Sequence, residues 1–105
     1  MSWIYLFIAS FFEVGWPVGL KLAEISSYRI SWISFAVIMM MLSGIFLYLA
    51  QKTIPIGTAY AVWSGIGASC TFLIGVLFFH DTATLQRCIA VFLIVFGVVL
   101  LKYAR

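Results

Sequence analysis

Four long apolar stretches alternate with short polar segments along this chain. The stretches span approximately residues 3–22, 31–50, 58–79 and 85–103. Each is close to the ~20 residues that a helix needs to cross a bilayer. Their apolar residues fill every face, whereas the strands of a membrane β-barrel alternate in character over about ten residues. The pattern therefore predicts an all-α membrane protein, a single domain over residues 1–105 with four transmembrane helices per protomer.

Composition agrees with a lipid environment. Of the 105 residues, 66% are hydrophobic and 9% are charged, whereas soluble domains are about half apolar and about one-quarter charged. The net charge of +3 does not indicate a nucleic-acid partner, because the basic residues are scattered at the ends of the apolar stretches. Cys70 and Cys88 lack metal-ligand spacing and are interpreted as free thiols. We expect neither a cofactor nor a metal, and no catalytic grouping that would indicate an enzyme accompanies His80.

The basic residues give no bias in membrane orientation. With four spans, both termini and the 51–57 connection share one side of the membrane, and the 23–30 and 80–86 connections share the other. The basic residues divide evenly between the sides: Lys52, Lys102 and Arg105 on the first, and Lys21, Arg29 and Arg87 on the second. Orientation follows Lys/Arg asymmetry between short loops. Either another determinant, such as the order of translocation, sets the orientation, or the chain inserts both ways.

Glu13 is an acidic residue deep inside the first apolar stretch. A charge at the centre of a membrane helix costs roughly 2.5–3.5 kcal/mol to insert, so such a residue is a functional-site hypothesis by default. No Lys or Arg lies deep enough to neutralise Glu13, and its natural counter-charge is a proton or a cationic substrate. Competition between these two for one carboxylate is the physical basis of proton-coupled antiport.

The helical neighbours of Glu13 supply the first candidates for its site. Residues three and four positions apart share a helix face, which places Ser10, Trp16 and Pro17 beside Glu13. An indole offers an N–H donor and a cation-friendly face. Pro17 has no N–H, so the carbonyl of Glu13 loses its helical partner.

Further hydrogen-bond donors recur at membrane depth, namely Ser43, Tyr60 and Trp63. Helix packing is the alternative interpretation of each one taken alone. Four helices are too few to enclose a path across the membrane and also shield Glu13 from lipid, which favours a dimer. Oppositely oriented protomers would form the inverted repeat that many transporters use for alternating access. We therefore hypothesise an antiparallel, dual-topology homodimer.

Three segments of the chain resemble the small multidrug resistance family, and the likeness runs essentially from end to end. They are residues 12–16 (FEVGW) with 19–21 (GLK), residues 55–67 (PIGTAYAVWSGIG) and residues 97–102 (GVVLLK). The middle segment is long and specific. The last segment is similar to the helix through which family dimers form.

The resemblance implies a four-helix protomer in an antiparallel dimer of the bacterial inner membrane, which exports small organic cations in exchange for protons. By position, Glu13 would bind proton and substrate in alternation, and Tyr60 and Trp63 would line the site. Trp16 and Ser43 match positions that hydrogen-bond the glutamates in the guanidinium exporter branch, whereas the broad-specificity branch does not usually carry tryptophan at position 16. Guanidinium is therefore the expected substrate, and quaternary ammonium and other hydrophobic cations are the alternative.

The chain departs from the guanidinium branch at two positions on the face of Glu13. Ser10 stands where that branch typically has glycine, and Pro17 stands where it has alanine. Ser10 adds a hydroxyl group and volume beside Glu13, so these departures bear on the substrate range. An alternative of a different class is a membrane subunit that does not transport by itself, or half of a heteromeric pair.

Overall fold

The computed structural model describes residues 2–103 and consists of four helices within that range. The helices are α1 (Ser2–Ile25), α2 (Arg29–Gln51), α3 (Ile56–Phe78) and α4 (Leu85–Tyr103). Each is long and apolar enough to cross a membrane, which confirms the predicted all-α class and the four spans. The largest difference in bounds is at the end of α1, which continues past the predicted end at Leu22 to Ile25. Arg105, one of the basic residues in the orientation count, lies outside the described residues.

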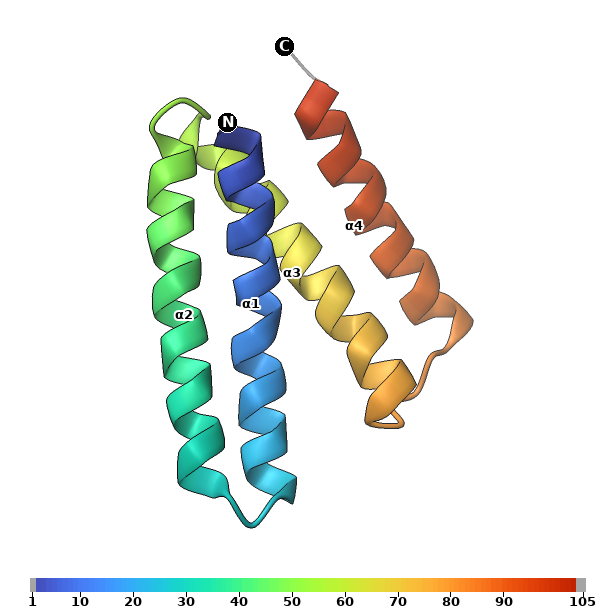
Figure 1. Ribbon diagram of the computed structural model, residues 1–105. Helices are drawn as coiled ribbons and strands as arrows, with labels where there is room; N and C mark the ends of the chain where they lie inside the picture. The colour runs from blue at the N-terminus through green and yellow to red at the C-terminus, as the bar shows by residue number, and fades with distance from the viewer. Residues whose placement is uncertain (1, 104–105) are drawn as a thin grey trace.

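The helices run alternately up and down, as Figure 1 shows. The first residues of α1, the connection between α2 and α3, and the end of α4 lie at one end of the protomer, and the other two connections lie at the opposite end. We call the latter the loop end. Helices α1 and α2 lie side by side, and α3 crosses α1 obliquely. Within residues 2–103, the backbone of α4 lies beside α3 alone.

Two glycines allow α1 to approach α2 closely. A Cβ atom at Gly15 would lie 2.9 Å from Cγ of Met39, and one at Gly19 would lie 2.9 Å from Cδ1 of Phe35. Small residues at a membrane helix interface let the backbones come together, because van der Waals packing and not hydrophobicity holds the helices. Gly15 and Gly19 therefore lie on the face of α1 that packs against α2.

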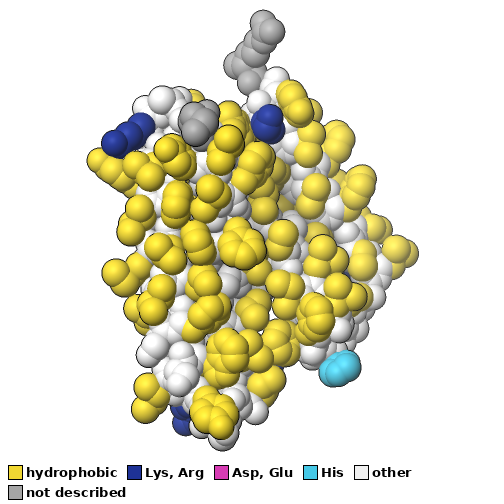
Figure 2. All heavy atoms as spheres, in the orientation of Figure 1, with side chains coloured by type: hydrophobic (Ala, Val, Ile, Leu, Met, Phe, Trp, Pro, Cys, Tyr) yellow, Lys and Arg dark blue, Asp and Glu magenta, His cyan; other side chains and the backbone are white. Residues whose placement is uncertain are grey.

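Most of the apolar surface of one protomer remains uncovered. The buried apolar cluster is small and lies toward the end of the protomer that carries the termini; it consists of Leu6, Ala50, Ile54, Ala59 and Val62. No residue of α4 is buried. Figure 2 shows hydrophobic side chains over nearly all of one face, with Lys and Arg only near its two ends. This distribution is typical of a surface that faces lipid or another membrane helix.

Candidate functional site

Glu13 lies where α1 crosses α3, opposite a residue that has no side chain. A Cβ atom at Gly67 of α3 would lie 2.6 Å from Cγ and 3.3 Å from Cβ of Glu13. Gly67 is buried, and Glu13 is partly buried. The crossing therefore places the acidic side chain between two helices at membrane depth, in a space that any larger residue at position 67 would fill.

Ser43 links α1, α2 and α3 through two hydrogen bonds. Its hydroxyl donates to the backbone carbonyl of Ala9 on α1 at 2.8 Å, and it accepts a hydrogen bond from Nε1 of Trp63 on α3 at 2.8 Å. The Ser43 side chain is buried. A serine hydroxyl carries a single hydrogen, so the bond to Ala9 commits that hydrogen, and the bond from Trp63 fixes the orientation of the indole.

The polar side chains near the Glu13 carboxyl group are those of Trp16 and Ser43. No base accompanies them within the described part of the chain. The only ion pair there joins Nζ of Lys21 to Oε2 of Glu24 at 3.8 Å, toward the loop end. Because a carboxylate at membrane depth needs a partner, this geometry leaves Glu13 available to a mobile cation or a proton.

The two aromatic residues predicted to line the site have different positions. The rings of Tyr60 and Trp63 meet edge to face, with centroids 5.4 Å apart and an interplanar angle of 63°. Trp63 is partly buried and bonded to Ser43, whereas Tyr60 is 57% exposed at the surface of the protomer. The structure thus brings Trp63 to Ser43 and leaves Tyr60 at the edge, in contact with the site through Trp63.

Ser10 lies on the helix face of Glu13, as the spacing predicted, but its hydroxyl is already used. It donates to the backbone carbonyl of Leu6 at 2.9 Å, one turn earlier in α1, and the side chain is fully buried. Ser10 therefore adds volume beside Glu13 without a free donor. At the other departure, Pro17, α1 stays helical from Ser2 to Ile25.

Sequence reasoning did not identify two groups that shape this site. One is Gly67, which the sequence analysis did not place against Glu13, and the other is the carbonyl of Ala9, which binds Ser43. The signal for Gly67 is the spacing of Gly67, Thr71 and Gly75, which puts small residues on one face of α3. Backbone acceptors such as the Ala9 carbonyl leave no signal in a sequence.

Comparison with known proteins gives a consistent result along the chain. Residues 1–104 match the family model described as Small Multidrug Resistance protein. A guanidinium exporter of Proteus vulgaris is 40% identical over 104 residues, covering 99% of both chains. A guanidinium exporter of Salmonella typhimurium strain LT2 is 42% identical over 102 residues, covering 97% of this chain and 96% of the relative. One of Yersinia pestis is 40% identical over 104 residues, covering 99% of both chains.

Proposed function

The chain belongs to the small multidrug resistance family, and we propose that it is a proton-coupled antiporter that exports guanidinium and related small guanidinyl cations. It is a multi-pass protein of the bacterial inner membrane. The observation that carries the proposal is the position of Glu13: an acid at membrane depth, beside Trp16 and Ser43, with no base near it in residues 2–103. The guanidinium exporters among the relatives support the choice of substrate.

Guanidinium suits such a site for geometric reasons. The ion is planar and carries N–H donors in a fixed fork, which pairs with a carboxylate through parallel hydrogen bonds. A protonated carboxyl group has lost the negative charge and presents a donor at one of its two oxygens, so it cannot accept the two parallel hydrogen bonds of this pairing. Proton and substrate therefore exclude each other at Glu13, and each displaces the other on the face of the membrane where it is more abundant.

Ser43 and Trp63 are committed to other partners while Glu13 awaits substrate in this mechanism. The Ser43 hydrogen is directed to Ala9, and the Trp63 N–H is directed to Ser43. Neither group therefore saturates the carboxylate before substrate arrives. Rotation of the Ser43 hydroxyl from the Ala9 carbonyl to Glu13 would stabilise the charged form when the proton leaves.

The functional unit in this proposal is an antiparallel homodimer with two facing Glu13 carboxylates. Three observations support it: no residue of α4 is buried in the single protomer, Tyr60 is exposed beside the site, and Glu13 is only partly buried. A second protomer in the opposite orientation would cover these surfaces and provide the inverted symmetry for alternating access. Tyr60 would then contact the partner protomer and couple the two halves.

Export of quaternary ammonium cations is the second candidate function. The exposed ring of Tyr60, edge to face with Trp63, offers aromatic surface to a cation that has no N–H donor. Against larger cations stands the volume that the fully buried Ser10 side chain adds on the helix face of Glu13.

Proteoliposomes separate the two candidates. Purified protein is reconstituted, a gradient of guanidinium or of a tetra-alkylammonium ion is applied, and the proton flux is followed with an internal pH dye. We expect guanidinium to drive proton movement and Glu13→Gln to abolish it. Flux with the tetra-alkylammonium ion and none with guanidinium would establish the second candidate instead.

A further inference from the structure

A pocket between α1 and α3 opens about one turn beyond Glu13, toward the loop end. Its volume is about 180 Å³, and its lining includes Pro17 and Lys21 of α1, Thr71 and Gly75 of α3, and Asp81 of the following connection. Pro17 is four residues after Glu13 and therefore lies on the same helix face. The pocket thus lies one turn from Glu13 along the same pair of helices, on the side of the loop end.

One face of α3 packs against two carboxylate side chains, those of Glu13 and Asp81. Gly67, Thr71 and Gly75 are each four residues apart and share a face of α3. Gly67 leaves room for Glu13, and Gly75 leaves room for Asp81, whose carboxylate a Cβ atom at position 75 would meet. Eight residues of helix span about 12 Å, so the two carboxylates are separated by roughly two helical turns.

Polar groups line the interval between the carboxylates. Thr71, which carries a hydroxyl group, lines the pocket together with Pro17. Because Pro17 has no N–H, the carbonyl of Glu13 lacks its helical donor and remains an acceptor that points along α1 toward Pro17. The Thr71 hydroxyl and the Glu13 carbonyl are therefore the polar groups closest in sequence position to this interval.

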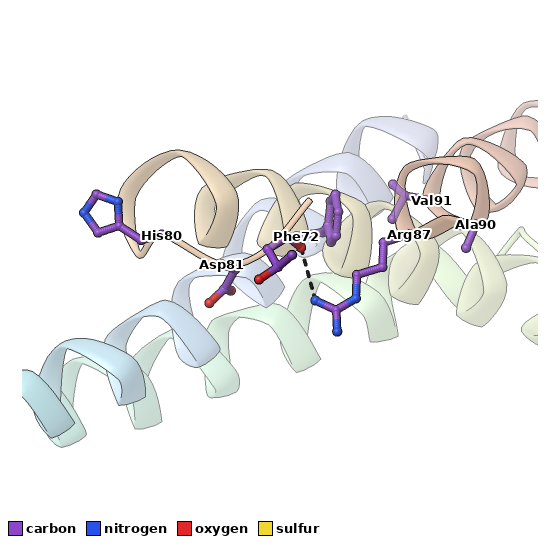
Figure 3. A pocket seen from close by; sticks show the side chains of 7 residues that line it. Phe72, His80, Asp81, Arg87, Ala90 and Val91 are labelled. Carbon is purple, nitrogen blue, oxygen red and sulfur yellow. Dashed lines mark hydrogen bonds between the residues drawn. The ribbon is translucent and has the colours of Figure 1, made fainter. Parts of the chain in front are cut away.

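Two basic side chains lie near the loop end of this pocket. Lys21 lines the pocket itself, and Arg87 lines the adjoining groove between α3 and α4 that Asp81 also lines. Figure 3 shows Arg87 reaching across that groove, where its Nη1 donates to the carbonyl of Thr82 at 3.1 Å. Of the acidic residues in the described chain, only Asp81 lines both spaces, since Glu24 lies on α1 paired with Lys21. Because Glu24 already pairs with Lys21, Asp81 is the carboxylate that these two spaces offer against the charge of Arg87.

We propose that this pocket is the loop-end opening of the Glu13 site, and that Asp81 keeps it accessible to cations by adding a negative charge beside the basic side chains of Lys21 and Arg87. Asp81 acts on the field at the opening, as a positioning residue, and does not bind substrate in the transport site. The inference rests on the proposed function. In an antiparallel pair each face of the membrane would present one such opening, so the effect would apply to uptake of the cation on one side and its release on the other.

The test is the guanidinium concentration dependence of transport in proteoliposomes at low and high salt. Asp81→Asn keeps the size and shape of the side chain against Gly75 and removes the charge. We expect the KM for guanidinium to rise about fivefold at low ionic strength, as one unscreened charge near a surface opening would give, while kcat changes little. The increase should shrink at high ionic strength, because salt screens exposed charges.

Two further variants separate charge from structure. Asp81→Glu keeps the negative charge and should retain the wild-type KM for guanidinium. The double variant Asp81→Asn with Lys21→Gln has the same net charge as wild type, and its KM should return toward the wild-type value. An unchanged KM in Asp81→Asn at low salt would overturn the proposal. So would a raised KM that neither salt nor the double variant corrects, since that would indicate a structural defect. Glu13→Gln measured in parallel keeps the outcomes distinct, because its retained coupled transport would contradict the proposed function itself.

Discussion

The side chain of Glu13 on α1 occupies the space that Gly67 on α3 leaves free. A Cβ atom at position 67 would lie 2.6 Å from Cγ of Glu13, which is closer than two non-bonded carbon atoms can approach. The flexible acidic side chain, and not a rigid backbone, is what would have to move. The relationship makes Gly67 part of the site, although glycine has no functional group.

We expect Gly67→Ala to displace the Glu13 carboxylate and to reduce guanidinium transport at least tenfold, because small misplacements of a binding group remove much of its effect. The measurement is guanidinium-driven proton flux in proteoliposomes. Gly44→Ala is the matched control, since a Cβ atom at position 44 meets nothing within 4 Å in the protomer. Equal transport by the two variants would show that the Glu13 side chain accommodates the extra methyl group.

Competition at Glu13 predicts a definite pH dependence of guanidinium binding. Protonation removes the charge that holds the cation, so the apparent affinity should rise with pH through the range in which the carboxyl group titrates and become constant above it. Isothermal titration of the detergent-solubilised protein at a series of pH values would measure this. Glu13→Gln should show no guanidinium binding at any pH. Binding by wild type that is independent of pH would contradict a shared site for proton and cation.

Removal of the Ser43 hydroxyl should affect stability and transport together. Ser43→Ala leaves the Trp63 N–H and the Ala9 carbonyl without their partner, and an unsatisfied buried polar group costs about 1–3 kcal/mol. We expect a lower thermal unfolding midpoint, a changed indole fluorescence and a raised KM for guanidinium. Ser64→Ala is the control. The Ser64 hydroxyl donates to the backbone carbonyl of Tyr60 at 2.8 Å, within the same helix, and so links no two helices. If Ser43→Ala has the fluorescence spectrum of the wild type, the Ser43 hydroxyl does not position the Trp63 indole.

Substitutions of Trp16 separate its N–H group from its bulk. Trp16→Phe keeps an aromatic ring beside Glu13 and loses the donor, so we expect weaker guanidinium binding with the substrate range unchanged. Trp16→Ala removes the bulk as well and should admit small tetra-alkylammonium ions. Transport assays with both classes of cation would measure these effects. An unchanged substrate profile in Trp16→Ala would place the residue outside the substrate site.

A buried hydroxyl outside the site gives a prediction for stability. The Oγ atom of Ser69 is buried and has no hydrogen-bond partner in the described residues. Replacing such a group by an apolar one of similar shape is neutral or stabilising, and we expect Ser69→Ala to stabilise the protein by up to about 1 kcal/mol. Thermal unfolding in detergent measures the change. A lower unfolding midpoint would show that the hydroxyl has a partner in the assembled protein.

The local features of this protein can be predicted from the order of its residues alone. Hydropathy over about 20 residues is a local property, and it was enough to identify all four helices. The sequence also predicts that Glu13 is an acid with no base at its depth. Any helix that spans the membrane over this stretch must place residue 13 near its middle. The helical spacing that put Ser10 and Trp16 beside Glu13 is equally local.

Which helix faces meet depends on how the helices pack. Helical spacing put the Ser10 hydroxyl near Glu13, but the hydroxyl is bonded to the backbone carbonyl of Leu6, because a serine inside a helix can donate to the carbonyl four residues earlier. The joining of Ser43 to Ala9 and Trp63, and of Glu13 to Gly67, depends on the crossing of three helices. Crossing geometry follows from close packing of small residues between helices, and no local pattern within one helix specifies the residue that faces it on another.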